Sequence, residues 1–419
     1  MFDRKIAPAF AKEFSFDLPQ PEIIPLSNNS NLVWIKELHQ EVVKLDFVFR
    51  AGKWFEPKIG VAYFTASMLE KGAGSFNAKA IAEVLDQHGA QVEVSAGSDF
   101  SSFSVYSVTK NLDKILSVVM EMLLHPTFPE DELVLAKNIF NQNLKVNNEK
   151  NSHVASKIFK RNIFGKQHPY GSSIEESDTL DISMTDLNTF FKNRFFPFEI
   201  YVTGPLKNHQ IKTLVDSFSS FQYINPLTID VHEQKNTTLR EKILKPESIQ
   251  TSIRLGKKTI TRSHPDYVAL LLVNHILGGY FGSRLMKNIR EEKGLTYGIS
   301  SSIHSHLHES IFSIGTDVNK DKLEIIMIEI QKEITKLRSE PISLEELELS
   351  KNHILGNLQL EISNAFSITE KIKNLRLNQL PSDYYTDLFK KIKETNSSYL
   401  QKIVNTYLDW ETMYEVTVG

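Results

Sequence analysis

Residues 281–298 read FGSRLMKNIREEKGLTYG, a helix-like stretch that ends at a glycine and continues into a strand-like one. The spacing predicts a helix from Ser283 to Lys293, and Gly294 is the kind of residue that commonly ends a helix. From Leu295 to Gly315 the residues alternate between small polar and apolar types, which is typical of strands. This segment therefore predicts a helix followed directly by part of a sheet.

The first half of the chain has the same order of elements. A helix expected over residues 78–88, with Asn77 as its N-cap, ends at Gly89, and alternating residues follow. Each half also closes with a strand that ends in glycine, over residues 198–204 and 414–419. The repeat spacing of roughly 210 residues predicts an α+β protein with two homologous domains, each an antiparallel sheet packed with helices.

The polar stretch between the two halves, which includes Pro226, sets the expected domain boundaries. We predict a first domain over residues 1–220, a linker over 221–236 and a second domain over 237–419.

Local pattern makes two further predictions for the first domain. Residues 31–37 and 42–50 are rich in β-branched and aromatic types and are expected to form a hairpin. Pro57 is expected to open a helix that runs to about Lys71 and stops at Gly72.

The composition excludes several classes of function. The 48 basic and 51 acidic residues give a net charge of −3, so no basic field points to nucleic acid or to anionic membrane. The absence of cysteine excludes thiolate metal sites, iron–sulfur clusters and cysteine nucleophiles. The longest apolar stretch, residues 267–277, is too short to span a bilayer. We expect a cytoplasmic protein without a membrane span, or a periplasmic one if a signal peptide has been removed.

Without cysteine, the candidate metal ligands are histidine, aspartate and glutamate. The helical motifs His-x-x-Glu-His and His-Glu-x-x-His do not occur in the sequence. His304, His306 and His308 alternate in strand-like sequence and could meet a metal on one face, although a solvated strand face is the favoured interpretation. His275 is interpreted as a core histidine, and Glu149 with His153 as an exposed helical pair.

The segment at 281–298 resembles the corresponding segment of the M16 (pitrilysin-type, inverzincin) metallopeptidases, in particular those with short two-domain chains. Shorter matches extend the resemblance over nearly the whole chain: Phe49–Gly52, the helix start at Gly60, Leu69–Gly72, His168–Gly171 and the glycine that closes each half.

This resemblance implies that the first helix of the chain should carry His-x-x-Glu-His. Alignment on Leu69–Gly72 places Tyr63 and Ser67 at the two histidines and Ala66 at the glutamate. The third ligand, a glutamate about 75 residues further on, corresponds to Asn143, and the second acidic position of that helix corresponds to Ala136. These side chains cannot supply the imidazoles, the carboxylate and the general base of a zinc peptidase, so we expect no metal and no cofactor on this chain.

The resemblance also implies two substrate-binding residues in the second domain, Arg290 and Tyr297. A guanidinium can donate hydrogen bonds to a peptide carbonyl, and a phenol can donate to a developing oxyanion.

Together these features predict a non-catalytic subunit of an M16-like zinc peptidase. A homologous partner with an intact His-x-x-Glu-His would supply zinc and base, and this chain would contact the peptide substrate. The alternative is a homodimeric scaffold or peptide-binding protein without peptidase activity. A peptidase that uses the His304–His308 group is the least favoured possibility.

Overall fold

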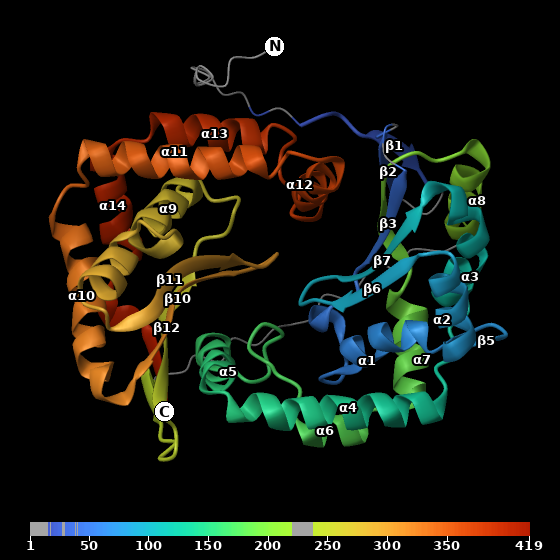
Figure 1. The fold of residues 1–419 in the computed structure, drawn as a ribbon, viewed down its shortest axis with the longest axis horizontal. Helices are drawn as coiled ribbons and strands as arrows, with labels where there is room; N and C mark the ends of the chain where they lie inside the picture. The colour runs from blue at the N-terminus through green and yellow to red at the C-terminus, as the bar shows by residue number, and fades with distance from the viewer. Residues whose placement is uncertain (1–15, 17, 27–29, 38, 40, 220–237) are drawn as a thin grey trace, which may run out of the picture.

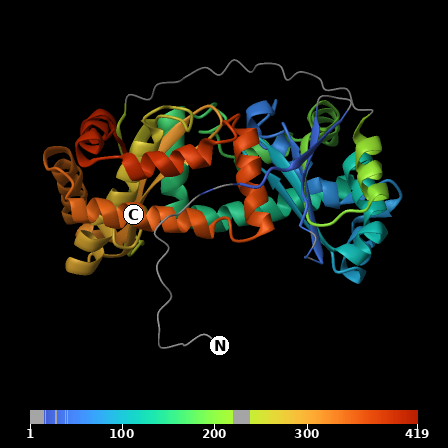
Figure 2. The ribbon, with the colours of Figure 1, turned by 90° about the horizontal axis from the view of Figure 1, so that it is seen from above.

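The computed structural model describes residues 16, 18–26, 30–37, 39, 41–219 and 238–419. The predicted linker at 221–236 lies outside these residues. Two halves lie side by side along the long axis of the molecule, the first in blue to green and the second in yellow to red (Figures 1 and 2).

The first half is built on a six-stranded sheet with the order β1-β2-β8-β3-β7-β6. The predicted strands at 31–37 and 42–50 exist, but they do not form a hairpin. The last strand of the half, β8, lies between them and pairs parallel with β2 and antiparallel with β3. The strands are β1 (Glu22–Pro25), β2 (Asn31–Ile35), β3 (Val42–Phe49), β6 (Gln91–Ala96), β7 (Ser101–Val108) and β8 (Pro197–Thr203), and a separate two-stranded sheet joins β4 (Gly72–Ala73) to β5 (Phe76–Asn77).

The second sheet repeats this plan with the order β11-β12-β10-β13-β9. Its strands correspond in turn to β6, β7, β3, β8 and β2, and its one parallel pair, β13 with β9, corresponds to β8 with β2. The predicted fold class is therefore confirmed. Each sheet is mixed, because it contains one parallel pair of strands among antiparallel ones. The strands are β9 (Arg240–Ile243), β10 (Gln250–Thr259), β11 (Thr296–Ser305), β12 (Ser310–Asn319) and β13 (Tyr414–Val418).

The helices follow the strands in the same order in both halves. None of the helices in the described part of the chain combines the length and the apolar character that crossing a membrane requires. In the first half they are α1 (Val61–Ser67), α2 (Ala78–Gln87), α3 (Leu112–Leu124), α4 (Glu130–Glu149), α5 (Asn151–Phe164), α6 (Glu176–Asp181), α7 (Met184–Arg194) and α8 (Asn208–Ser219), with short 3₁₀ turns η1 (Lys53–Phe55), η2 (Met68–Glu70) and η3 (Thr109–Asn111). In the second half they are α9 (Tyr267–Asn274), α10 (Leu323–Ser339), α11 (Leu344–Leu360), α12 (Ala365–Leu377), α13 (Tyr384–Glu394) and α14 (Ser397–Tyr407), with the π-helical segments η4 (His275–Gly279) and η5 (Met286–Glu292) and the 3₁₀ turns η6 (Lys320–Lys322) and η7 (Trp410–Thr412).

Two helix starts show how local chemistry sets the boundaries. The predicted cap of α2 is confirmed, because the Asn77 side chain accepts a hydrogen bond from the Ala80 N–H at 2.9 Å. The prediction that a helix opens at Pro57 is wrong, since α1 begins at Val61. Gly60 has a left-handed φ of 97°, and Glu56 accepts hydrogen bonds from the N–H groups of Gly60 and Ala62.

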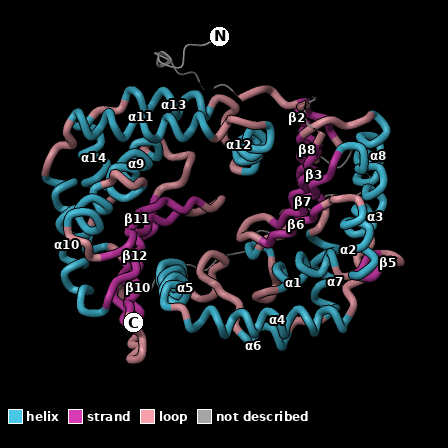
Figure 3. Tube along the Cα trace, in the orientation of Figure 1, coloured by secondary structure: helices cyan, strands magenta, loops and turns pink. Residues whose placement is uncertain are grey.

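One helix from each half packs on the sheet of the other half. Helix α5 packs on β10 and β13, where its Phe159 shares a buried cluster with Val416, and α12 packs on β8 through Ile372. Figure 3 shows both helices on the inner faces of the sheets, opposite the outer helices of each half. The packing of α5 and α12 therefore joins the two halves through their hydrophobic cores, in addition to the chain that connects them.

Buried ion pairs fix the position of α12 on the first sheet. The Lys373 ammonium lies 2.6 Å from the carboxylate of Asp46, which is fully buried, and Arg376 donates to Glu199 at 2.9 Å. Removal of one partner would leave a buried charge unpaired, which is costly. The ion pairs therefore oppose displacement of α12 from the first sheet.

Candidate functional site

Helices α1 and α4 carry the positions that the resemblance assigns to metal ligands, and two of these positions meet. Tyr63 and Asn143 line one cavity of about 480 Å³ between the two helices. The Tyr63 side chain is 40% exposed, and its ring packs 5.1 Å from that of Phe140. The structure thus brings the first and third predicted positions together at an open pocket.

The other predicted positions do not line this pocket. Ala66 is buried in the core of the first half, and Ala136 packs partly buried against the same core. The Ser67 hydroxyl donates a hydrogen bond to the Phe64 carbonyl at 3.1 Å, which is a helix-internal bond. A phenol, a methyl, a hydroxyl and an amide do not form a donor set for zinc, so the residues at these positions do not fit that ion. Within the residues that the structure describes, no three His, Asp or Glu side chains group closely enough to hold a metal.

The pocket contains ionisable side chains that the sequence did not single out as a group. Burial raises the pKa of Glu56 to about 7, against the opposing effect of the Ala62 and Gly60 N–H groups and of Lys53. Burial lowers the pKa of Lys53, and it lowers the pKa of His153 together with nearby lysines. His153 lies in the first turn of α5, whereas Glu149 ends α4, so these two do not form the predicted pair on one helix.

The second predicted site lies at η5 and the start of β11. Arg290 donates from Nε to the Tyr297 carbonyl oxygen at 3.0 Å, and its guanidinium lies 4.5 Å from the centre of the Phe281 ring. The Tyr297 side chain is 94% exposed. The structure therefore places these two residues in contact and presents the phenol to solvent. Their role toward a substrate stays a prediction.

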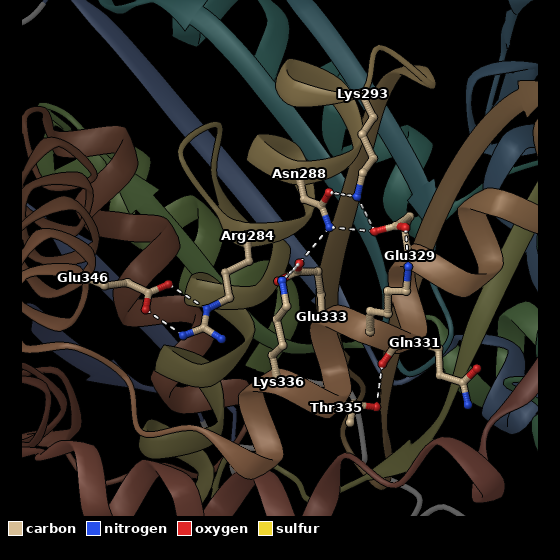
Figure 4. Close-up of polar contacts among 10 residues, drawn as sticks. Arg284, Asn288, Lys293, Glu329, Gln331, Glu333, Thr335, Lys336 and Glu346 are labelled. Carbon is tan, nitrogen blue, oxygen red and sulfur yellow. Dashed lines mark hydrogen bonds and ion pairs between the residues drawn. The ribbon is translucent and has the colours of Figure 1, made fainter.

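A buried polar network anchors η5, the segment that carries Arg290 (Figure 4). The Asn288 amide donates to Glu329 at 3.2 Å and to Glu333 at 2.7 Å, and both carboxylates are only 5% exposed. Lys293 contacts Asn288 and Glu329, and hydrogen bonds from Lys293 and Lys332 lower the pKa of Glu329 to about 2. The polar residues of this segment thus serve mainly to hold its backbone, while Arg290 is half-buried and Tyr297 is exposed.

A two-point ion pair holds the start of the same segment. Arg284 donates to both carboxylate oxygens of Glu346 on α11, at 2.8 and 2.7 Å (Figure 4). Such a bidentate contact fixes orientation as well as distance.

The three histidines predicted to share a strand face do not do so, because β11 ends at Ser305. The His304 ring bonds to Ser302 within the strand. His306 and His308 lie in the following turn and stack on Tyr170 and Trp54 of the first half, with ring centres 4.1 Å apart in both cases.

Hydrogen bonds reinforce this contact between the halves. The Leu307 N–H donates to Asp99 at 3.0 Å, and the His308 N–H donates to the Tyr170 hydroxyl at 3.2 Å. Within the first half, the Tyr170 hydroxyl donates to Asp99 at 2.5 Å. The turn after β11 is therefore a docking contact between the two halves.

The chain is similar to known families and proteins over most of its length. Residues 32–177 match the family described as Insulinase (Peptidase family M16), and residues 181–354 match the domain described as Peptidase M16 inactive domain. With the duplicated fold, these matches show that the chain belongs to the M16 peptidase family.

Similar proteins have divergent descriptions. An uncharacterized zinc protease YmxG of Bacillus subtilis is 25% identical over 352 residues, covering 82% of this chain and 84% of that protein. A protein of Helicobacter pylori described as non-peptidase homolog YmxG is 20% identical over 373 residues, covering 87% and 86%.

Two solved structures share the fold. The M16 inactive domain structure from Pseudomonas fluorescens superimposes with a TM-score of 0.86 at 23% identity, covering 96% of this chain and 98% of that one. A protease from Helicobacter pylori superimposes with a TM-score of 0.85 at 18% identity, covering 96% and 100%.

Proposed function

We propose that this chain is the non-catalytic subunit of a two-subunit M16 peptidase. A homologous partner with an intact His-x-x-Glu-His supplies zinc and the general base, and this chain supplies peptide contacts through Arg290 and Tyr297. The observation that carries the proposal is the contrast between the two sites. The positions of the zinc motif hold Tyr63, Ala66 and Ser67, whereas Arg290 and Tyr297 are both present and in mutual contact, and the Tyr297 side chain is exposed.

The chemistry of this pair supports a role in substrate binding. The Arg290 Nε is engaged with the backbone of Tyr297, which orients the guanidinium, and a guanidinium has further N–H donors with which to meet a peptide carbonyl. The exposed Tyr297 hydroxyl can donate to the oxyanion that forms when the peptide carbonyl is attacked. The anchored segment beneath them limits how far either residue can move.

The test is to mix the purified chain with a homologue that carries His-x-x-Glu-His and to follow peptide hydrolysis. We expect neither chain alone to cleave well and the mixture to be active. Tyr297→Phe should lower kcat of the mixture by roughly 10²–10³-fold if the phenol serves the oxyanion. Since Tyr297 is 94% exposed, this variant should keep the stability of the wild type.

Matched controls separate substrate contact from general damage. Arg240→Ala removes an exposed arginine of the second half, and Tyr399→Phe removes an exposed hydroxyl on α14. Both should leave the activity of the mixture unchanged, whereas Arg290→Ala should reduce it. Unchanged activity in Arg290→Ala and Tyr297→Phe would remove the assigned role.

The second candidate is a homodimeric scaffold or peptide-binding protein, as the description of the Helicobacter pylori relative as a non-peptidase homologue favours. Isolation of the chain from its own cells distinguishes the two. Co-purification with a zinc-bearing homologue supports the first, and a homodimer without such a partner supports the second.

A further inference from the structure

Two imidazoles from different helices face each other in the second half. His275 begins η4 and His353 lies on α11, and the Nε2 atom of His275 is 3.0 Å from the Nδ1 atom of His353. Asn357, one turn further along α11, places its side-chain amide 3.3 Å from the same Nδ1 atom. The ring of Tyr280 stacks on that of His275 at 4.6 Å. The Nδ1 atom of His353 thus lies within 3.3 Å of side-chain groups from both His275 and Asn357.

These separations match those between neighbouring ligands of one metal ion. With metal–nitrogen distances of about 2.0–2.1 Å, ligands at angles of about 90–110° lie about 2.9–3.4 Å apart. The spacings of 3.0 and 3.3 Å fall in this range without any movement of the backbone. The Asn357 amide can turn its oxygen rather than its nitrogen toward the ion, since the two orientations have nearly the same shape.

The exposure of the cluster also suits a metal ion. His353 and Asn357 are exposed, whereas His275 is only 7% exposed. A hydrated ion can therefore reach the site from solvent and find one ligand already fixed.

The position of the cluster within the duplicated fold is a separate observation. In chain order, α9 with η4 and then α11 correspond to α1 with η2 and then α4 of the first half. The His275–His353 contact thus lies between the same pair of helices as the Tyr63–Asn143 pocket. The helix also widens into a π-turn at His275, a distortion that is often found at functional sites.

We propose that His275, His353 and Asn357 bind one divalent transition-metal ion of the class that prefers imidazole, with Zn²⁺ or Ni²⁺ as the probe. Water completes the coordination, and the ion joins η4 to α11. This site is independent of the proposed peptidase partnership, because it uses none of the residues assigned to substrate.

The test is calorimetric titration of the full-length chain with ZnCl₂ and, separately, NiCl₂ after dialysis against a chelator. We expect one equivalent to bind. His353→Ala should weaken binding by about tenfold or more, because it removes one of two imidazoles. Asn357→Asp should tighten binding, since a charged oxygen replaces a neutral one. Tightening is a result that a purely structural histidine pair would not give.

Control variants locate the bound ion. His304→Ala removes a histidine of the other His-rich segment, and His39→Ala removes an exposed histidine of the first half, and both should bind as the wild type does. Thermal unfolding of each apo variant verifies that it is folded, and Zn²⁺ should raise the melting temperature of the wild type more than that of His353→Ala. The proposal is overturned if the wild type binds no ion, if His353→Ala binds equally well, or if binding is lost in His304→Ala instead.

Discussion

Substitution of Asn288 by alanine tests whether the polar network that anchors η5 stabilises the second half. The Asn288 amide donates to two carboxylates, those of Glu329 and Glu333, and its oxygen accepts from Lys293 at 2.6 Å. Hydrogen bonds to charged groups contribute about 1.5–3 kcal/mol each. Lysines still pair with both carboxylates in the variant, so part of this is retained. We expect a loss of about 2–4 kcal/mol in the free energy of unfolding.

The assay is urea unfolding at pH 7 with a thermal melt in parallel. For a unit of this size, about 2–4 °C is lost per kcal/mol, so the melting temperature should fall by about 4–16 °C. Asn405→Ala is the matched control, because Asn405 is exposed on α14 and should change stability by less than about 0.5 kcal/mol. Asn288→Asp should be worse than alanine at pH 7, since it adds a third negative charge beside two buried carboxylates.

The pH dependence gives an independent check. The folded-state pKa of Glu329 is about 2, below its ordinary value of 4.5. The stability that this carboxylate contributes is therefore complete above pH 4.5 and is lost as the pH falls toward 2. An Asn288→Ala variant that matches the wild type within 0.5 kcal/mol at pH 7 would refute this account of the network.

Two further predictions concern the first half. Trp54→Ala removes the stacking contacts with His308 and Tyr170 and should lower the free energy of unfolding by about 1–3 kcal/mol in a urea titration, whereas Trp54→Phe should lose less than half as much. Because the folded-state pKa of Glu56 is raised to about 7 from 4.5, stability should fall as the pH rises from 4.5 through 7. Glu56→Gln should abolish that part of the pH dependence, and an unchanged profile would contradict the burial of this carboxyl.

The sequence predicted which segments form strands better than it predicted which strands pair with one another. Alternation identified β2 and β3 as strands, but their separation by β8 depends on a strand about 150 residues further along the chain. Local pattern carries no information on such pairing. The duplication was visible because each copy repeats its breaks at equivalent positions, as at Gly89 and Gly294, both of which have a positive φ.

The same limit applies to the candidate sites. Arg290 and Tyr297 are seven residues apart, so one continuous segment was enough to mark both, and the structure places them in contact. The Glu56 pocket and the His275–His353 contact bring together residues from separate helices, and no short motif marks them. His308 was grouped with His304 by spacing alone, whereas the end of β11 at Ser305 sends it to a different partner.

The exchange of helices bears on how the chain could work with a partner. Helix α12 is held on the first sheet by the buried Lys373–Asp46 and Arg376–Glu199 pairs, and α5 is held on the second sheet by apolar packing. Separating the halves would expose both interfaces and leave buried charges unpaired, which is strongly unfavourable. The Tyr63–Asn143 pocket and the Arg290–Tyr297 pair therefore keep a fixed position relative to each other. In the proposed assembly the partner chain binds to this chain without changing the relative position of its two halves. The placement of the partner's zinc relative to Arg290 and Tyr297 therefore depends on the interface between the two chains.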